Sequence, residues 1–281
     1  MIPQESINQL IELSEAYNKE CYFEGDPIIF PKHFALIMEG KDGIFKFTNK
    51  EIPFGGGVEM GLNNEILPGN GSNNCHYKSY VPSMQDVEIA GIIAAHLAWG
   101  RRDMIIRDCK RAFDEMGWRP YDYVMAGRYR DDDASLHRTI KWSEFARICS
   151  NLREYFSKNE TLETIDADKI RVDIFGQKSN PKAANKKIHM FRRWMVRNDG
   201  VVDLGLWKNT SPATLTIPLD VHVHRSAINL GITSRKSADL TTATEITDFL
   251  KKVFPDDPCK GDFALFAYAA TKLKEQEQAQ K

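Results

Sequence analysis

The feature that most constrains this chain is the division of its sequence from Ser83 onward into amphipathic segments of helix length. The first segment, "SMQDVEIAGIIAAHLAWG", begins with a serine suited to the N-cap, carries acidic residues in its first turn and ends at Gly100. Further segments with helical punctuation or helical spacing of apolar residues cover 101–117, 141–159, 185–200, 239–254 and 261–276, and one near the start covers 5–19. Strand signals are few, so the sequence predicts a mainly all-α fold.

Composition narrows the class of protein further. The 281 residues are enough for one large domain or two lobes, and 42% hydrophobic residues are enough to form a core. The net charge of −1 argues against a uniformly basic nucleic-acid binder but leaves room for a local basic groove. The five cysteines are scattered without a CxxC pair, which excludes a zinc ribbon and a four-cysteine iron–sulfur cluster and favours reduced thiols in a cytoplasmic protein.

Two other stretches bear on the organisation of the chain. The longest apolar run, "IAGIIAAHLAW", is far shorter than the ~20 residues that span a bilayer, and the N-terminus has no signal-peptide pattern. We therefore expect a soluble protein with no membrane partner. Residues 39–83 are rich in glycine and asparagine and contain short β-like pieces, so we expect an irregular insertion there, with a hairpin as one option.

The stretch "PLDVHVHRSAINLGI" at 218–232 allows two interpretations. An acid and two imidazoles alternate in it as Asp220, His222 and His224. On a strand the three side chains would share one face and could bind one metal ion, whereas on a helix, at ~100° per residue, they would point in different directions. The strand interpretation leads to a metal-dependent hydrolase.

Helical punctuation is the stronger pattern in this stretch. Pro218 breaks the preceding chain, Asp220 stands where an N-cap or first-turn acid belongs, and Gly231 suits the C′ position. The apolar residues at helical spacing are Val223, Ala227 and Leu230. We therefore predict a helix that begins at Asp220, whose dipole keeps that carboxylate ionised, and no metal site.

A basic segment precedes this helix. Between Asp173 and Asp199 the chain has no acidic residue and seven basic ones: Lys178, Lys182, Lys186, Lys187, Arg192, Arg193 and Arg197. Aromatic residues are interleaved with them, and Asn185 suits the N-cap of a helix with free N–H groups. The segment is either a phosphate-binding groove or a solvated helix face.

A lysine at the start of a helix can also act as a nucleophile. The helix dipole and neighbouring cations disfavour the ammonium form, so we expect a lowered pKa. A neutral lysine amine is a nucleophile that forms a Schiff base at an electrophilic carbon. An ionised carboxylate such as Asp220 stabilises a cationic sugar at the transition state.

Two of these stretches resemble parts of a known family. "LDVHVHRSAINLGI" resembles the element that holds the catalytic aspartate in the endonuclease III-like DNA glycosylases of the helix-hairpin-helix superfamily, and "NKKIHMFRRW" stands where that family has its hairpin and nucleophilic lysine. Most of residues 22–270 resembles an uncharacterised bacterial family of that superfamily, through "DPIIFP", "DVEIAGIIAAHLAWGRRDMI", "LHRT" and "DDPCKGDFALF". The glycine turn of the glycosylase hairpin is absent from "NPKAANKK".

The resemblance implies a base-excision enzyme that acts on a damaged base flipped out of DNA, with AP-lyase activity as an option. It assigns Asp220 as the catalytic carboxylate and either Lys186 or Lys187 as the nucleophile, and it implies no cofactor, metal or iron–sulfur cluster. We expect two helical lobes around a cleft: 84–198, and 1–38 together with 199–281.

The expected nucleic-acid contacts come from three places. The basic segment supplies Lys178, Lys182, Arg192, Arg193 and Arg197. The loop "HLAWGRRD" falls where the glycosylases enter the duplex, which implies Trp99, Arg101 and Arg102, although Trp99 in the core with surface arginines is the simpler alternative. Arg225 completes the set.

Two histidines outside that set, and the function itself, leave alternatives open. His96 lies in an apolar helix and is expected to be a hydrogen-bonded core residue, while His137 and Arg138 of "LHRT" could line the cleft. A non-catalytic nucleic-acid-binding protein of the same fold is the main alternative to the glycosylase. The metal-dependent hydrolase on Asp220, with its two histidines, is the other.

Overall fold

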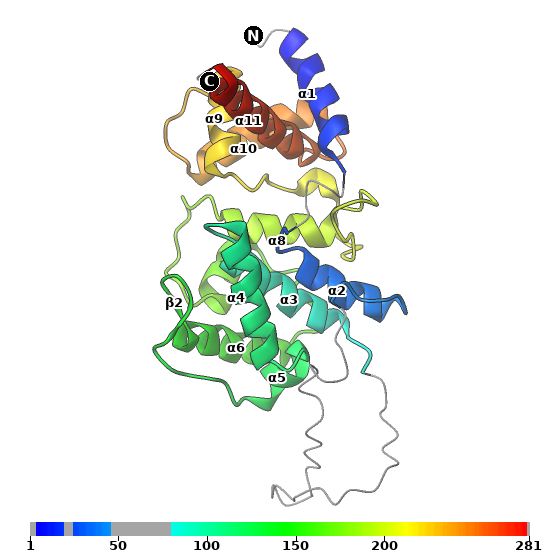
Figure 1. The fold of residues 1–281 in the computed structure, drawn as a ribbon, viewed down its shortest axis with the longest axis vertical. Coiled ribbons are helices and arrows are strands. Elements are labelled where there is room, and N and C mark those ends of the chain that lie inside the picture. Colours follow the sequence, from blue (N-terminus) through cyan, green and yellow to red (C-terminus); the bar gives the residue numbers. More distant parts are fainter. Residues whose placement is uncertain (1–3, 20–24, 46–79, 280–281) are drawn as a thin grey trace, which may run out of the picture.

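The computed structural model describes residues 4–19, 25–45 and 80–279, with side chains up to residue 269. Its helices are α1 (Gln4–Tyr17), α2 (Ile29–Met38), α3 (Met84–Leu97), α4 (Arg102–Glu115), α5 (Pro120–Ala126), α6 (Trp142–Phe156), α7 (Ala167–Lys169), α8 (Lys186–Val196), α9 (Val221–Asn229), α10 (Leu240–Val253) and α11 (Lys260–Ala279). The described part also contains a π-helical turn (Ile170–Ile174), a 3₁₀ turn (Pro212–Thr214) and one antiparallel hairpin of β1 (Ser135–His137) and β2 (Ile140–Lys141). The mainly helical fold predicted from the sequence is confirmed (Figure 1).

Helix α3 is the centre of the molecule. A capping box begins it, because Ser83 Oγ accepts the Asp86 N–H at 3.3 Å and Asp86 Oδ2 accepts the Ser83 N–H at 2.8 Å. Its residues from 86 to 97 are all buried, as expected of a helix that is apolar on every side. Gly91 lets α8 approach closely, since a Cβ there would lie 2.6 Å from the ring of Phe191.

The helices form two groups (Figure 1). Helix α11 packs against both α1 and α9 at one end of the molecule, and α3 packs against α2, α4 and α5 at the other, with α8 against α3 in between. Helix α2 therefore lies with the helices of the expected first lobe, not with α1. The reason is its apolar face, since Phe30 and Phe34 are fully buried.

The sequence did not predict three of these elements. No helix was expected at 29–38, a stretch near Pro27 that contains Pro31, but α2 begins at Ile29 with Pro31 in its first turn, where a missing N–H is tolerated. Helix α5 and the β1–β2 hairpin were also missed. Most of the expected insertion 39–83, including any hairpin in it, lies outside the described residues.

A buried carboxylate, Glu88 on α3, ties distant loops to this centre. It accepts hydrogen bonds from Thr161 Oγ1 at 2.5 Å, the Leu162 N–H at 3.1 Å and Trp207 Nε1 at 2.7 Å. Burial raises the pKa of Glu88 to about 7, although the three donors oppose that rise. Among the described residues, no helix has the length and apolarity needed to cross a membrane.

Replacing Glu88 with alanine tests this connection. Glu88→Ala leaves three donors without their acceptor, so we expect the free energy of unfolding in urea to fall by about 3 kcal/mol. Glu154→Ala, at an exposed site whose carboxylate pairs with exposed Lys158, should leave the unfolding curve unchanged. Equal, small effects of both substitutions would contradict the structural role of Glu88.

Candidate active site

A cavity of about 380 Å³ is lined by residues in or just before α2, α4, α8, α9 and α11. Its walls come from five separate segments of the chain, within residues 26–27, 98–105, 186–193, 218–223 and 262–266. This volume is within the usual range for small-molecule sites, roughly 300–1,000 Å³.

Each of those segments leads into a helix or includes residues of its first turn. The cavity is lined by Asp26 just before α2, Arg102 at the start of α4, Lys186 at the start of α8, Asp220 before α9 and Asp262 in the first turn of α11. The N-terminal end of a helix carries a partial positive charge and unsatisfied N–H groups. The cavity therefore combines a positive backbone field with three aspartates that offset it.

Asp220 caps α9, as the sequence predicts. Its Oδ1 accepts the N–H groups of His222 and Val223, each at 2.8 Å, and Gly231 follows the helix with a φ of +69°. The carboxylate is partly exposed, and its Oδ2 has no hydrogen bond among the described residues. One oxygen thus fixes the side chain and the other is available to a ligand.

Lys186 is the lysine that shares the cavity with Asp220. It is the first residue of α8, and within the described chain its ammonium has no hydrogen bond or ion pair. Asn185 precedes it in the N-cap position, but the prediction that Asn185 caps the helix is wrong. Asn185 has a left-handed backbone (φ 45°), and its side chain accepts a hydrogen bond from Arg171 at 3.2 Å.

Lys187 does not line the cavity. Its ammonium donates to the carbonyl oxygen of His96 and lies 5.7 Å from the ring centroid of Trp99. Burial lowers the pKa of Lys187 to about 8, against the opposing effect of Glu144. The expected lowering of a lysine pKa therefore occurs at Lys187, and its main cause is burial.

Asp26 and Asp262 are site residues that sequence reasoning missed. Burial raises the pKa of both carboxyl groups, to about 6 for Asp262, whose pKa Arg193 pulls down and Asp220 pushes up. Both belong to stretches that carried the family resemblance, "DPIIFP" and "DDPCKGDFALF". Nothing in their local spacing indicated that the fold would bring them to one cavity.

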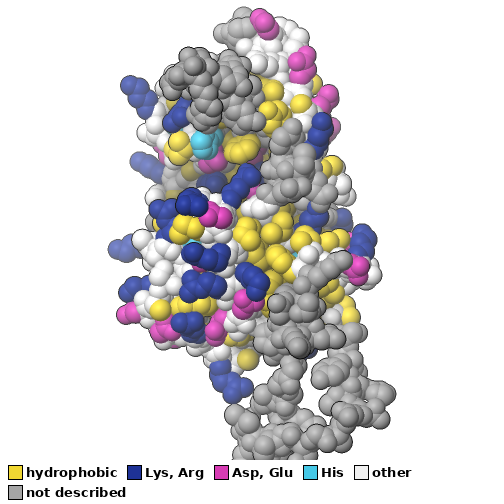
Figure 2. Space-filling view, in the orientation of Figure 1, with side chains coloured by type: hydrophobic (Ala, Val, Ile, Leu, Met, Phe, Trp, Pro, Cys, Tyr) yellow, Lys and Arg dark blue, Asp and Glu magenta, His cyan; other side chains and the backbone are white. Residues whose placement is uncertain are grey.

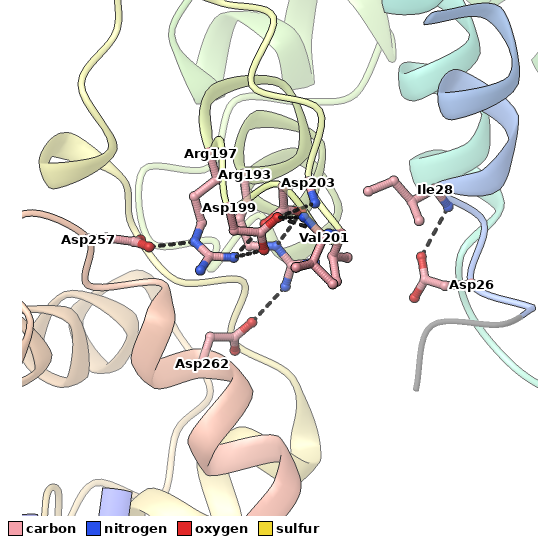
Figure 3. Close-up of polar contacts among 10 residues, drawn as sticks. Asp26, Ile28, Arg193, Arg197, Asp199, Val201, Asp203, Asp257 and Asp262 are labelled. Atoms are coloured by element: carbon pink, nitrogen blue, oxygen red, sulfur yellow. Dashed lines mark hydrogen bonds and ion pairs between the residues drawn. The ribbon is translucent and has the colours of Figure 1, made fainter. Parts of the chain in front are cut away.

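Two arginines of the predicted basic groove are buried in an ion-pair network (Figure 3). Arg193 contacts Asp203 at 3.3 Å and Asp262 at 2.9 Å. Arg197 contacts Asp203 at 2.7 Å and Asp257 at 2.6 Å, and Asp199 at 2.9 Å.

This burial corrects the predicted nucleic-acid role of both arginines. Burial alone would lower their pKa, but the facing carboxylates raise the pKa of each above its ordinary value, so both stay charged. Arg192 is half-buried; it donates to the Ile165 carbonyl at 2.7 Å and lies 5.8 Å from the ring centroid of Trp207. Arg193 and Arg197 hold elements together and offer no exposed cation to a phosphate.

Other predicted contact residues remain on the surface. Lys178, Lys182, Arg101, Arg102 and Arg225 are exposed. Figure 2 shows that Lys and Arg side chains gather along one side of the face it presents. Arg102 also lines the cavity that Asp220 and Lys186 line.

Trp99 is half-buried at the cavity wall. It is therefore neither a fully buried core residue nor a fully exposed one. The guanidinium carbon of Arg138 lies 4.2 Å from its ring centroid. His137 is fully buried. Its Nε2 is hydrogen-bonded to the Trp99 carbonyl at 2.9 Å, and its Nδ1 is hydrogen-bonded to the Asp108 carboxylate at 2.8 Å. His137 therefore positions this wall and does not itself line the cavity.

His96 is confirmed as a core residue, hydrogen-bonded to Glu144 at 3.0 Å.

The metal-site interpretation of 220–224 is contradicted. The stretch is helical, and Nε2 of buried His224 is bonded to the Arg235 carbonyl at 2.9 Å, while His222 is exposed beside the cavity. In the part of the chain that the structure describes, no group of three histidine, cysteine, aspartate or glutamate residues is arranged to hold a metal ion.

Sequence comparison places the chain in a family. The pattern of the family described as "protein of unknown function (DUF2400)" matches residues 75–174 and 167–271, and the chain belongs to it. Neither the curated proteins nor the solved structures give a match.

The buried network makes a stability prediction. Arg197→Met leaves carboxylates buried without their partner, so we expect the free energy of unfolding to fall by about 3–5 kcal/mol. Urea denaturation followed by circular dichroism measures it. Arg225→Met, at an exposed site on α9, is the matched control and should leave the midpoint unchanged. A wild-type midpoint for Arg197→Met would show that the network is not needed for stability.

Proposed function

We propose that the chain is a DNA glycosylase that excises a base from a flipped nucleotide through a covalent lysine intermediate. One observation carries the proposal: Lys186, whose amine has no partner among the described residues, and Asp220, whose Oδ2 is free in the same sense, line one cavity. A nucleophile and an ionised carboxylate around one space are the two groups that this chemistry requires. The sequence resemblance to the helix-hairpin-helix glycosylases supports the same reaction.

The reaction assigns a role to each group. The neutral amine of Lys186 attacks C1′ as the bond between C1′ and the base breaks, and the base leaves with the bonding electrons. The Asp220 carboxylate stabilises the positive charge that develops on the sugar. Loss of the amine proton and opening of the sugar ring then give a Schiff base between Lys186 and C1′.

The surroundings of the cavity support a nucleic-acid substrate. Arg102 is exposed at the cavity wall without an ion pair among the described residues, and Lys178 and Lys182 extend the exposed positive charge along the chain before α8. Cations in such positions neutralise backbone phosphates. Those same exposed lysines would also serve a non-catalytic nucleic-acid-binding protein, which is the second candidate and forms no covalent adduct.

Borohydride trapping separates the two candidates. We expect the wild-type protein, mixed with an oligonucleotide duplex that contains an abasic site, to give an adduct after borohydride reduction, visible as a shifted band on a denaturing gel. Lys186→Met should abolish the adduct, whereas Lys187→Met should retain it, because Lys187 lies outside the cavity. No adduct with the wild-type protein in this assay would favour the non-catalytic candidate.

Asp220→Asn tests the carboxylate. Asparagine also serves as an N-cap, so the variant should fold with an unchanged unfolding midpoint. Loss of the charge should lower single-turnover base release, on a substrate found by screening lesion-containing duplexes, by a factor of about 100 or more. DNA binding should persist or tighten, as measured by fluorescence anisotropy. Wild-type base release by a folded Asp220→Asn protein would contradict the role given to Asp220.

A further inference from the structure

We propose that His222 is the general base that removes the C2′ proton of the Schiff base and so converts base excision into strand cleavage. The inference rests on the proposed function, because the Schiff base on Lys186 is its starting point. It assigns a catalytic residue to β-elimination, the AP-lyase step that the resemblance leaves as an option, at the same cavity.

The position of His222 carries the proposal. Its side chain lines the cavity from the first turn of α9, two residues after Asp220. The residue is exposed, and neither ring nitrogen makes a hydrogen bond within the described chain. The ring of Phe266, another lining residue, meets the imidazole edge-on with centroids 6.4 Å apart, which holds the ring at the wall without using its nitrogens.

The other ionisable groups of the cavity take part in other interactions. Lys186 is consumed in the Schiff base, Asp220 Oδ1 caps α9, and Asp262 is paired with Arg193 at 2.9 Å. Asp26 accepts the Ile28 N–H at 3.0 Å. Histidine is also the side chain whose ordinary titration range suits proton abstraction near neutral pH.

The chemical step balances without a further reactant. The imidazole takes the C2′ proton, and the electrons of the C2′–H bond form a C2′=C3′ double bond. The bond between C3′ and its phosphate oxygen breaks, and the phosphate leaves with that bonding pair. The strand is cut on the 3′ side of the sugar, and His222 then returns its proton to solvent.

Charged groups from each of the five lining segments share the cavity with this imidazole. They are Asp26 before α2, Arg102 on α4, Lys186 and Arg193 on α8, Asp220 before α9 and Asp262 on α11. Cations and carboxylates are mixed among them, so neither charge type dominates the surroundings of the ring.

The test uses the full chain and a duplex with a preformed abasic site, so that base release is not required. His222→Ala should form the borohydride-trapped adduct at the wild-type level but cut the strand about 100-fold more slowly. Free imidazole in the buffer should restore much of the lost cleavage. Val221→Ala, at an exposed neighbouring position that does not line the cavity, should cut at the wild-type rate.

His222→Gln separates base catalysis from positioning, because glutamine keeps a polar side chain but accepts no proton in this range. Cleavage that stays low in His222→Gln and recovers with imidazole supports the proposal. Wild-type cleavage by either variant, or no rescue of His222→Ala by imidazole, overturns it. If the wild-type protein itself forms no adduct with the abasic duplex, the proposed function fails first, and the two failures are thereby distinguished.

Discussion

The buried ion-pair network around Arg193 and Arg197 is the interaction on which the arrangement of the cavity depends. The guanidinium of Arg193 on α8 and that of Arg197, the residue after α8, hold carboxylates from the following loop, from the segment before α11 and from α11 itself (Figure 3). Charges taken out of water are costly unless every partner is present. The network therefore requires α8 and α11 to meet in one geometry, and Lys186 and Asp262 belong to those two helices.

That geometry explains why charged residues gather at the cavity. Five helices present their N-terminal ends to the cavity, and each of these ends carries a partial positive charge. Aspartates at 26 and 220 satisfy the N–H groups that such ends expose, each through one oxygen. In the described part of the chain the second oxygens and the amine of Lys186 have no hydrogen-bond partner, so the folding requirement and the proposed chemistry use the same side chains.

Local signals in the sequence were sufficient for those parts of the fold that local interactions determine. Ser83 and Asp220 were recognised as N-caps because a cap acts within three residues of its own position. Helix α2 was missed because burial of its apolar face against α3, a long-range effect, outweighs the signal of two prolines. Arg193 and Arg197 were misjudged for two reasons. Their partners Asp262 and Asp257 lie 69 and 60 residues away, where charge counting along the chain cannot detect them. Their nearer partners, Asp199 and Asp203, lie just outside the acid-free stretch that was counted. The choice between two adjacent lysines likewise depended on packing.

The most direct measurement of the central claim is the location of a trapped adduct in the chain. The wild-type protein is reduced with borohydride in the presence of an abasic duplex, digested with nuclease and protease, and sequenced by tandem mass spectrometry. The account predicts that the reduced sugar is attached to Lys186. Attachment to Lys187 or to an exposed lysine such as Lys178 would contradict it, as would the absence of any modified peptide.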